Sequence, residues 1–319
     1  MKQERLVKVE DIPDTLRCTS TKHLRLPEKL ITVWFSLLNK NGIREQAKKG
    51  SRKSTAGGLT KQAAKDHLAW RFTGSAVRVE LAMLSPNHKK SEISDAFAKI
   101  FSGGKVLLAD APCGSGAAAL SVLTTIAELR AQSVLPRMPL EVVLIGGEIS
   151  DHARTNFITA IKEIKQDLEK QAITISEYEM RWDVCDSLSN TDFIQQLTLL
   201  GNKCGARMLL LANFSEFLQE NGKWKKAQPQ FDELFRHFRS ERSSAIWIEP
   251  QTNKASRDKG GFFGRVISWI EDKLKFASLF SCGESKDNVF RDCCKAFKPL
   301  DNTNTFRTQL AVIRVDLDI

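Results

Sequence analysis

The sequence of 319 residues lacks features that define several well-known classes of protein. No window approaches 18 consecutive apolar residues, so no membrane-spanning helix is expected. The seven cysteines form no Cys-x-x-Cys pair, which disfavours a structural zinc site. The one tyrosine, Tyr178, disfavours an oxidoreductase that works through a Tyr-Lys pair. The charged stretch MKQERLVKVEDIPD contains no apolar segment of a secretory signal. Together with the dispersed cysteines, these absences predict a cytoplasmic protein with reduced thiols and no membrane partner.

Positive charge is concentrated in the first third of the chain. Residues 1–105 hold 21 of the 48 Lys and Arg residues but only 10 of the 38 Asp and Glu residues. Within residues 44–65, REQAKKGSRKSTAGGLTKQAAK, seven basic residues accompany one acidic residue. The Gly, Ser and Thr residues between them predict a flexible loop at about 44–62. This loop is either a solvated linker or an arm that contacts the phosphates of a nucleic acid, and the one-sided charge favours the second.

The pattern of predicted elements changes near residue 100. Apolar residues at helical spacing predict helices over 26–40, 59–86 and 91–101. Further along, apolar runs alternate with helical segments, one of them at 262–276, and predict strands at 105–111, 140–148, 173–183, 206–214, 243–250, 288–297 and 306–317. This alternation predicts an α/β fold with a mostly parallel sheet. We therefore expect a basic helical extension over 1–100 and a Rossmann-like domain over 101–319.

A glycine turn joins the first predicted strand to a helix in VLLADAPCGSGAAAL, residues 106–120. Gly114 and Gly116 let the backbone approach a ligand, and the following helix start offers free N–H groups. With Ala119 they fit Gly-x-Gly-x-x-Ala, a dinucleotide fingerprint. However, Asp110 places a carboxylate beside the turn, which favours a cofactor with an ammonium group over a pyrophosphate.

The acidic residue that ends the second strand also disfavours NAD. Glu148 lies 32 residues beyond Gly116, whereas the dinucleotide fingerprint places its acidic residue about 20 residues on. A carboxylate at this strand end can hydrogen-bond ribose hydroxyls in either class of cofactor. The spacing therefore favours a different nucleoside cofactor.

Cys113 follows Asp-Ala-Pro, as does the nucleophilic cysteine of RNA 5-methylcytosine methyltransferases. In that family the segment comes after the cofactor glycines, whereas no strand with a glycine turn precedes residue 106 here. We therefore expect Cys113 to be a small buried residue in a cofactor turn and not a nucleophile.

These motifs together resemble class I S-adenosylmethionine-dependent methyltransferases. LLADAPCGSG (107–116) and VLIGGEIS (143–150) are similar to the first two motifs of that family. MRWDVCD (180–186) and LLLANFSEF (209–217) resemble the third and fourth. The resemblance covers about residues 95–319 and implies a mostly parallel Rossmann-like sheet with an antiparallel last strand. It also implies S-adenosyl-L-methionine as the cofactor.

The resemblance implies a set of cofactor-binding residues, in motif order Asp110, Ala111, Pro112, Gly114, Ser115, Gly116, Glu148, Ile149, Asp183, Val184, Asn213 and Phe214. Glu148 would bind the ribose. Asp183 would bind the adenine amino group, or Asp186 would do so if the third strand ends later. Trp182 or Val184 would flank the adenine ring.

Methyl transfer from a sulfonium needs little acid–base help, so candidate catalytic residues are few. Asn213 stands where many amino-methyltransferases carry Asn-Pro-Pro-aromatic, but without the prolines. It either accepts a hydrogen bond from an acceptor amine or only ends the strand. Glu249 ends the fifth strand, and open parallel sheets bind ligands at that edge. Asn213 and Glu249 are the candidate catalytic residues, and His67 is expected to be a packing or surface residue.

A second resemblance concerns residues 65–84, 209–218 and 246–274. They are similar to the methyltransferase-like family linked to assembly of the small mitochondrial ribosomal subunit, and to its bacterial relatives. This implies a helical extension over the cofactor cleft, through which Trp70 and Arg71 can reach it, and an RNA setting. Those proteins can carry a cysteine cluster, whereas adjacent Cys293 and Cys294 on a strand would face opposite sides, so no metal is expected.

Two functional hypotheses follow. The first is an S-adenosylmethionine-dependent methyltransferase that acts on RNA, which the basic first third would contact. The alternative is a catalytically inactive cofactor-binding protein that serves as an assembly or complex subunit, because the fourth motif offers no obvious catalytic residue.

Overall fold

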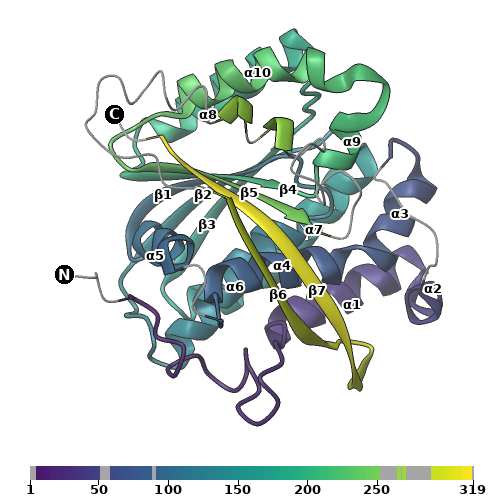
Figure 1. Ribbon diagram of the computed structural model, residues 1–319, viewed down its shortest axis with the longest axis vertical. Coiled ribbons are helices and arrows are strands. Elements are labelled where there is room, and N and C mark those ends of the chain that lie inside the picture. Colours follow the sequence, from purple (N-terminus) through teal and green to yellow (C-terminus); the bar gives the residue numbers. More distant parts are fainter. Residues whose placement is uncertain are drawn as a thin grey trace.

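A single seven-stranded sheet forms the centre of the computed structural model, which describes residues 5–50, 58–87, 91–251, 264–266, 268–270 and 289–317. The strand order is β3-β2-β1-β4-β5-β7-β6 (Figure 1). The strands are β1 (Gly104–Asp110), β2 (Leu140–Gly147), β3 (Ile173–Met180), β4 (Ala206–Ala212), β5 (Ser243–Pro250), β6 (Val289–Lys298) and β7 (Asp301–Asp316). The first five run parallel, and β7 lies antiparallel between β5 and β6. The predicted fold class, a mostly parallel Rossmann-like sheet with an antiparallel last strand, is confirmed.

Helices cover both faces of the sheet, with α8, α9 and α10 on one side and α1, α4 and α6 on the other (Figure 1). The helices are α1 (Glu28–Asn41), α2 (Arg44–Lys49), α3 (Lys61–Trp70), α4 (Phe72–Leu84), α5 (Ser91–Ile100), α6 (Ala117–Ala131), α7 (Asp151–Glu169), α8 (Ser187–Gly201), α9 (Ser215–Gln219) and α10 (Lys223–Phe238). A 3-10 turn, η1 (Glu220–Gly222), connects α9 to α10.

The continuous apolar runs of the central strands are explained by burial on both faces. In β1, Val106 and Leu108 belong to one hydrophobic core, and Leu107 and Ala109 belong to the other. Successive side chains of a strand point to opposite faces, so a strand covered on both sides requires apolar residues at every position. The carboxyl ends of β1 to β5 consequently meet at one edge, which is where the candidate site lies.

The N-terminal helices share a core with the sheet. Apolar residues from Val7 to Leu84 pack in one cluster with residues of α6, α7 and β7. Leu24 also bridges to Ala296 on β6: its N–H donates to the carbonyl of Lys295, and its carbonyl accepts from Phe297. The extension predicted over 1–100 is therefore packed directly on the sheet.

The segment predicted as a loop at about 44–62 contains a helix. Arg44–Lys49 form α2, whose residue Gln46 accepts a 3.0 Å hydrogen bond from the indole of Trp70 on α3. Residues 51–57, the centre of the predicted loop, lie outside the described residues. Residues 44–49 form a helix despite their polar composition because this short helix packs on α3. Of the helix predicted at 262–276, the structure describes residues 264–266 and 268–270, which are helical.

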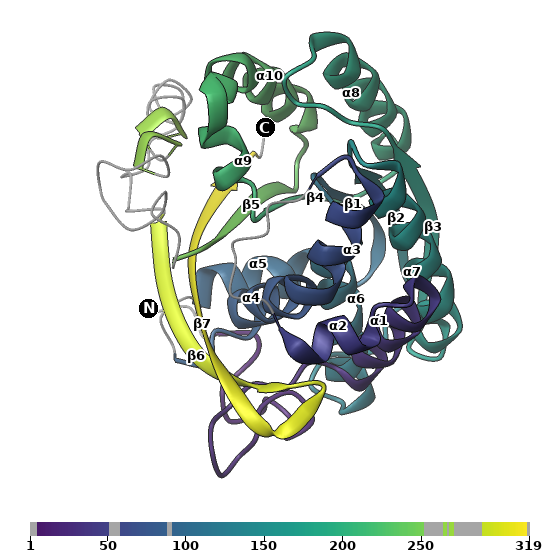
Figure 2. The ribbon, with the colours of Figure 1, turned by 90° about the vertical axis from the view of Figure 1, so that its right-hand side faces the viewer.

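The segment predicted as one or two helices over 59–86 forms α3 and α4, which meet at Arg71 and not at Gly74, the expected break. Helical hydrogen bonds continue across the junction, from the N–H of Arg71 to the carbonyl of His67 and from the N–H of Ser75 to that of Arg71. The two helices therefore form a nearly continuous rod, which lies beside the ends of β1 and β4 in its α3 part (Figure 2).

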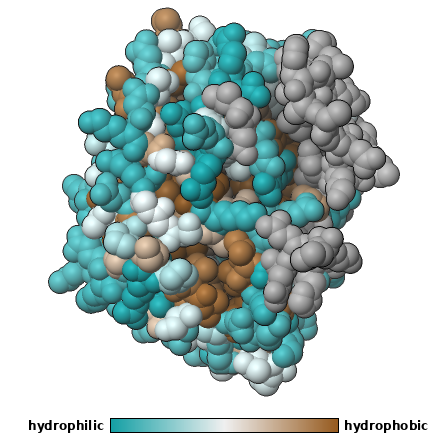
Figure 3. Space-filling model, turned by 90° about the vertical axis from the view of Figure 1, so that its left-hand side faces the viewer, coloured by the Kyte–Doolittle hydropathy of each residue, from teal (hydrophilic) through white to brown (hydrophobic). Residues whose placement is uncertain are grey.

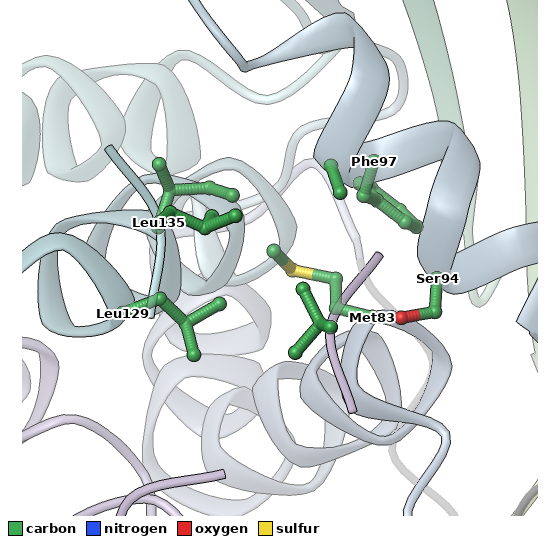
Figure 4. A pocket seen from close by; sticks show the side chains of 8 residues that line it. Met83, Ser94, Phe97, Leu129 and Leu135 are labelled. Carbon is green, nitrogen blue, oxygen red and sulfur yellow. The ribbon is translucent and has the colours of Figure 1, made fainter. Parts of the chain in front are cut away.

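A small apolar cavity of ≈ 10 Å³ lies between α4, α5 and α6 (Figure 4). Its lining includes Met83, Phe97, Leu129 and Leu135, with Ser94 at one side. The volume admits about one water molecule, and the apolar lining offers such a water too few partners. We interpret this cavity as a small gap in the packing of the core, next to the N-terminal segment.

The face shown in Figure 3 is mostly hydrophilic, with apolar side chains gathered in one area below the centre of the view. Among the described helices, none is both long and apolar enough to cross a membrane.

We expect Gly146→Ala to destabilise the protein by about 1–3 kcal/mol, the usual cost of overpacking a core. A Cβ atom at Gly146 would lie 2.6 Å from the ring of Phe157 and 2.9 Å from Sγ of Cys113. Gly205→Ala is the matched control, because the nearest atom to its Cβ would be 3.9 Å away. Urea unfolding of both variants checks this, and equal midpoints would contradict the packing described for the end of β2.

Candidate functional site

A glycine turn follows β1 and leads into α6. Gly114 and Gly116 have positive φ angles of 53° and 90°, a conformation that favours glycine. A Cβ atom at Gly116 would lie 3.0 Å from the ring of Phe157, whereas at Gly114 the nearest atom, Cε1 of His67, is 3.9 Å away. The turn is therefore tightly packed at Gly116. At Gly114 the backbone has more space, on the side that faces α3.

Asp110 ends β1 and is fully buried. Its Oδ2 accepts a 3.0 Å hydrogen bond from the N–H of Ala119. Among the described residues, its Oδ1 has no hydrogen-bond partner. Burial raises the pKa of Asp110 to about 7, opposed by the Ala119 hydrogen bond and reinforced by the nearby charge of Glu148. A buried carboxyl oxygen without a partner calls for a hydrogen-bond donor, and a cationic donor satisfies it best.

Glu148, after β2, holds the turn in place. Its Oε2 accepts a 3.1 Å hydrogen bond from the N–H of Gly114, and its Oε1 accepts one of 2.9 Å from Ser150. Burial raises the pKa of Glu148, and these backbone hydrogen bonds oppose the rise. Ile149, beside it, is half-buried. The predicted ribose ligand is therefore at the predicted strand end and also braces the glycine turn.

The rest of the turn is anchored by the sheet and by the N-terminal helices. Ala111 is buried and donates its N–H to the carbonyl of Leu210 on β4, while Pro112 is half-buried. Ser115 accepts a 3.5 Å hydrogen bond from Nδ2 of Asn156. Asn156 in turn accepts from Asn41 at the end of α1, at 3.0 Å. This chain of contacts ties the extension to the turn.

The residues after β3 divide into core and loop positions. Trp182 and Val184 are buried, and the indole of Trp182 donates to Oδ1 of Asn190 at 3.1 Å. Asp186 caps α8 by accepting from the N–H groups of Leu188 and Ser189. Asp183 is half-buried, and its Oδ1 accepts from Cys185. Each of the two predicted adenine ligands thus uses Oδ1 for backbone N–H groups, and the choice between Asp183 and Asp186 stays a prediction.

The side-chain oxygen of Asn213 is already occupied. Asn213 follows β4 with a φ of 57°, and Oδ1 accepts from Arg78 twice, from Nε at 3.1 Å and from Nη2 at 2.7 Å. A carbonyl oxygen has two lone pairs, so Arg78 takes both. No described residue accepts from Nδ2 of Asn213. The amide can therefore donate to a ligand, and the expectation that it accepts from an amine is not supported by this geometry.

Glu249 is held by the loop that follows β4. Its Oε1 accepts from the N–H of Phe214 at 2.8 Å, the N–H of Ser215 at 2.9 Å and the indole of Trp247 at 2.7 Å. Burial raises the pKa of Glu249, and these bonds oppose the rise. The geometry thus gives Glu249 a positioning role. Phe214, the predicted cofactor contact, is buried against Trp182.

Arg78 was not among the predicted site residues. Burial lowers the pKa of Arg78 to about 10, with Glu249 opposing and Arg71 reinforcing the shift. Burial, with Arg71 and Arg78, lowers the pKa of His67 to about 4. His67 therefore lies over Gly114 as a neutral imidazole, which is compatible with the expected packing role. A charged residue within the apolar stretch SAVRVELAML was the available signal for Arg78.

Cys113 is buried in the core, where burial and the charges of Asp110 and Glu148 raise its pKa well above the usual range. A thiol in that state is a poor nucleophile. In the described part of the chain, six cysteines are free and no group of three or more His, Cys, Asp or Glu residues is arranged for a metal ion.

Comparison with known proteins identifies no family. No protein-family model and no curated protein match the chain. Among solved structures, one similar fold is that of precorrin-6y C5,15-methyltransferase from Geobacter metallireducens GS-15, at 9% identity, 70% coverage of this chain and 88% of that chain, with a TM-score of 0.31. Another is a putative S-adenosyl-L-methionine-dependent methyltransferase from Methanococcus maripaludis, at 13% identity, 82% and 96% coverage and a TM-score of 0.30. The names of these two proteins make no link to ribosome assembly.

Asp110→Asn should change how stability depends on pH. The folded-state pKa of about 7 lies above the unfolded value near 4, so the stabilising contribution of the protonated carboxyl is present below pH 4 and is lost as pH rises through 7. Between pH 5 and pH 8 we expect the free energy of unfolding to fall by on the order of 2 kcal/mol more in the wild type than in the variant. Urea unfolding at both pH values measures this, and parallel losses would contradict it.

Proposed function

We propose that the protein is an S-adenosylmethionine-dependent methyltransferase that acts on RNA. The observation that carries the first part is the unpaired Oδ1 of Asp110 at a glycine turn, because a buried carboxyl there fits the ammonium group of this donor. The positive φ angles of Gly114 and Gly116 provide the backbone approach that a nucleoside cofactor needs.

Each motif then has a role in holding the cofactor. Glu148 lies at the strand end where ribose hydroxyls bind, and half-buried Asp183 is available to the adenine amino group. The N-terminus of α6 supplies N–H groups beside the turn. S-adenosylmethionine supplies, when bound, a methyl group that its sulfonium already activates. The chain therefore has to orient the acceptor and exclude water.

The same geometry disfavours a dinucleotide. The N–H of Gly114, which would face a pyrophosphate, is used by Glu148. Glu148 lies close enough to Asp110 for its negative charge to raise the pKa of Asp110. An anionic pyrophosphate would meet repulsion there.

RNA as the acceptor is supported by charge and its placement. Residues 1–105 carry all of the net positive charge. Helix α3, which carries exposed Lys61, reaches the glycine turn through His67, and α2, which carries exposed Lys48 and Lys49, is joined to α3 by the hydrogen bond between Trp70 and Gln46. Basic side chains on one side of a cleft bind a phosphate backbone. The free cysteines support a reducing compartment, the cytoplasm.

One observation favours the alternative of an inactive cofactor-binding subunit. Oδ1 of Asn213 and Oε1 of Glu249, the two candidate catalytic oxygens, are both occupied by hydrogen bonds within the protein. An acceptor hydroxyl or protonated amine would need a base, whereas an acceptor that presents a lone pair would not. Transfer of labelled methyl groups to bulk RNA distinguishes the two functions.

Calorimetric titration with S-adenosylmethionine tests the donor site. We expect Asp110→Asn to weaken binding by about tenfold or more, because a charged hydrogen bond is lost. Affinity of the wild type should rise between pH 6 and 8, as Asp110 loses its proton with a pKa of about 7.

Glu141→Gln is the matched control, because this exposed carboxylate lies at the opposite end of β2 and pairs with Lys105. NADPH is the control ligand. Binding of NADPH alone would reject the methyltransferase and restore the dinucleotide interpretation.

A further inference from the structure

The methyl donor proposed above carries two opposite charges at its amino-acid end. Its ammonium and carboxylate groups are attached to one carbon atom, so a site that holds the first group also has the second nearby. Asp110 accounts for the ammonium group through its buried Oδ1. A carboxylate that is removed from water needs hydrogen-bond donors, and the protein has to supply them near the glycine turn.

The backbone of the glycine turn offers few donors. Pro112 has no N–H group. Four other N–H groups of residues 111–116 already donate within the protein, namely those of Ala111 to Leu210, Cys113 to Gly147, Gly114 to Glu148 and Gly116 to Cys113. This leaves the N–H of buried Ser115, which donates to no described residue. One N–H group cannot satisfy a carboxylate with about four lone-pair sites, so a donor from outside the turn is needed.

The side chain of His67 faces this turn from α3. Its Cε1 lies 3.9 Å from the position that a Cβ atom on Gly114 would take. Cε1 joins the two ring nitrogens, so the N–H group is one bond away from the atom that faces the turn, whichever nitrogen carries it. His67 is half-buried, and no described residue forms a hydrogen bond with either ring nitrogen. Its N–H is therefore available to a ligand at the turn.

Asp110 and His67 act on neighbouring residues of the turn. Burial, and then the charge of Asp110, raises the pKa of the Cys113 thiol, and His67 faces the next residue, Gly114. Burial, with the charges of two nearby arginines, holds the pKa of His67 at about 4, so near pH 7 its imidazole is neutral and has one N–H to donate. The turn thus has an acceptor at the end of β1 and a donor on α3.

We propose that His67 donates a hydrogen bond to the carboxylate group of S-adenosylmethionine, while Asp110 accepts from its ammonium group. This rests on the donor part of the proposed function. The amino-acid end of the donor is then held between a carboxyl group of the sheet and an imidazole of the N-terminal extension. Helix α3 therefore takes part in donor binding, which none of the four motifs on the sheet indicated.

Three ligands separate the two charged groups in a calorimetric titration. S-adenosylmethionine has both groups, its decarboxylated form keeps the ammonium group, and methylthioadenosine has neither. We expect the wild type to bind S-adenosylmethionine about tenfold more tightly than the decarboxylated form, because the latter lacks one hydrogen bond to a charged group. This ratio is the carboxylate preference, and a general disturbance of the turn cancels in it.

His67→Phe keeps a ring of similar size and removes the N–H group. We expect the carboxylate preference to fall from about tenfold to about twofold or less in this variant. His67→Gln restores an N–H donor and should recover most of the preference. Asp110→Asn should weaken binding of both ligands that carry the ammonium group and keep the preference between them.

His237→Phe is the matched control. His237 is exposed at the end of α10, close to Arg239, whose carbonyl accepts from Arg207 at the start of β4. This is the opposite edge of the sheet from the glycine turn, so the control should keep both the affinities and the preference of the wild type.

Two results would overturn the proposal alone. In the first, His67→Phe keeps the carboxylate preference, so that other groups hold the carboxylate and His67 only packs against the turn. In the second, the wild type binds S-adenosylmethionine and its decarboxylated form equally well, so that nothing recognises the carboxylate. Failure of the wild type to bind any of the three ligands would reject the donor site and this proposal together.

Discussion

Three buried carboxyl groups at the carboxyl ends of β1, β2 and β5 organise the loops of the site. Asp110 accepts a backbone N–H from the start of α6, and Glu148 accepts one from the glycine turn after β1 and one from Ser150 before α7. Glu249 accepts two from the segment that joins β4 to α9. A buried carboxylate is costly unless it is hydrogen-bonded, so these contacts select one loop conformation over others. Among the described residues, the buried Oδ1 of Asp110 has no hydrogen-bond partner, and it is the position that we propose for a cationic ligand group.

Helices from the first third of the chain contact the same edge of the sheet. Arg78 reaches Asn213 from α4, and Asn41 reaches the glycine turn through Asn156. Because α4 is buried along most of its length, its side of the site is rigid, and an acceptor must fit a preformed surface. The packing of α2 on α3 brings their positive charges together beside this surface.

Much of the fold could be predicted because its signals are local. Alternating apolar runs and helical segments predicted the parallel sheet, and Gly114 with Gly116 marked the turn because only glycine fits the observed φ angles with little strain. The positions of Asp110 and Glu148 at strand ends followed from the same pattern.

The contacts that define the chemistry were not predictable, because they join distant residues. Arg78 and Asn213 are 135 positions apart, and Glu249 binds the N–H of Phe214 across 35. Composition around residue 44 predicted a loop, but packing of α2 on α3 outweighs that local preference. The sequence could not show that Asp186 would cap α8, because that depends on where the helix begins.

The bridge between Leu24 and Ala296 has a kinetic consequence. A segment near one end of the chain completes its backbone hydrogen bonds with a strand made more than 270 residues later. During synthesis, the apolar residues before α1 must wait for β6, and non-local contacts of this kind slow folding. Chaperones bind apolar surface that is exposed in that interval. The yield of folded protein in a cell should therefore depend on chaperones more strongly than its stability alone would indicate.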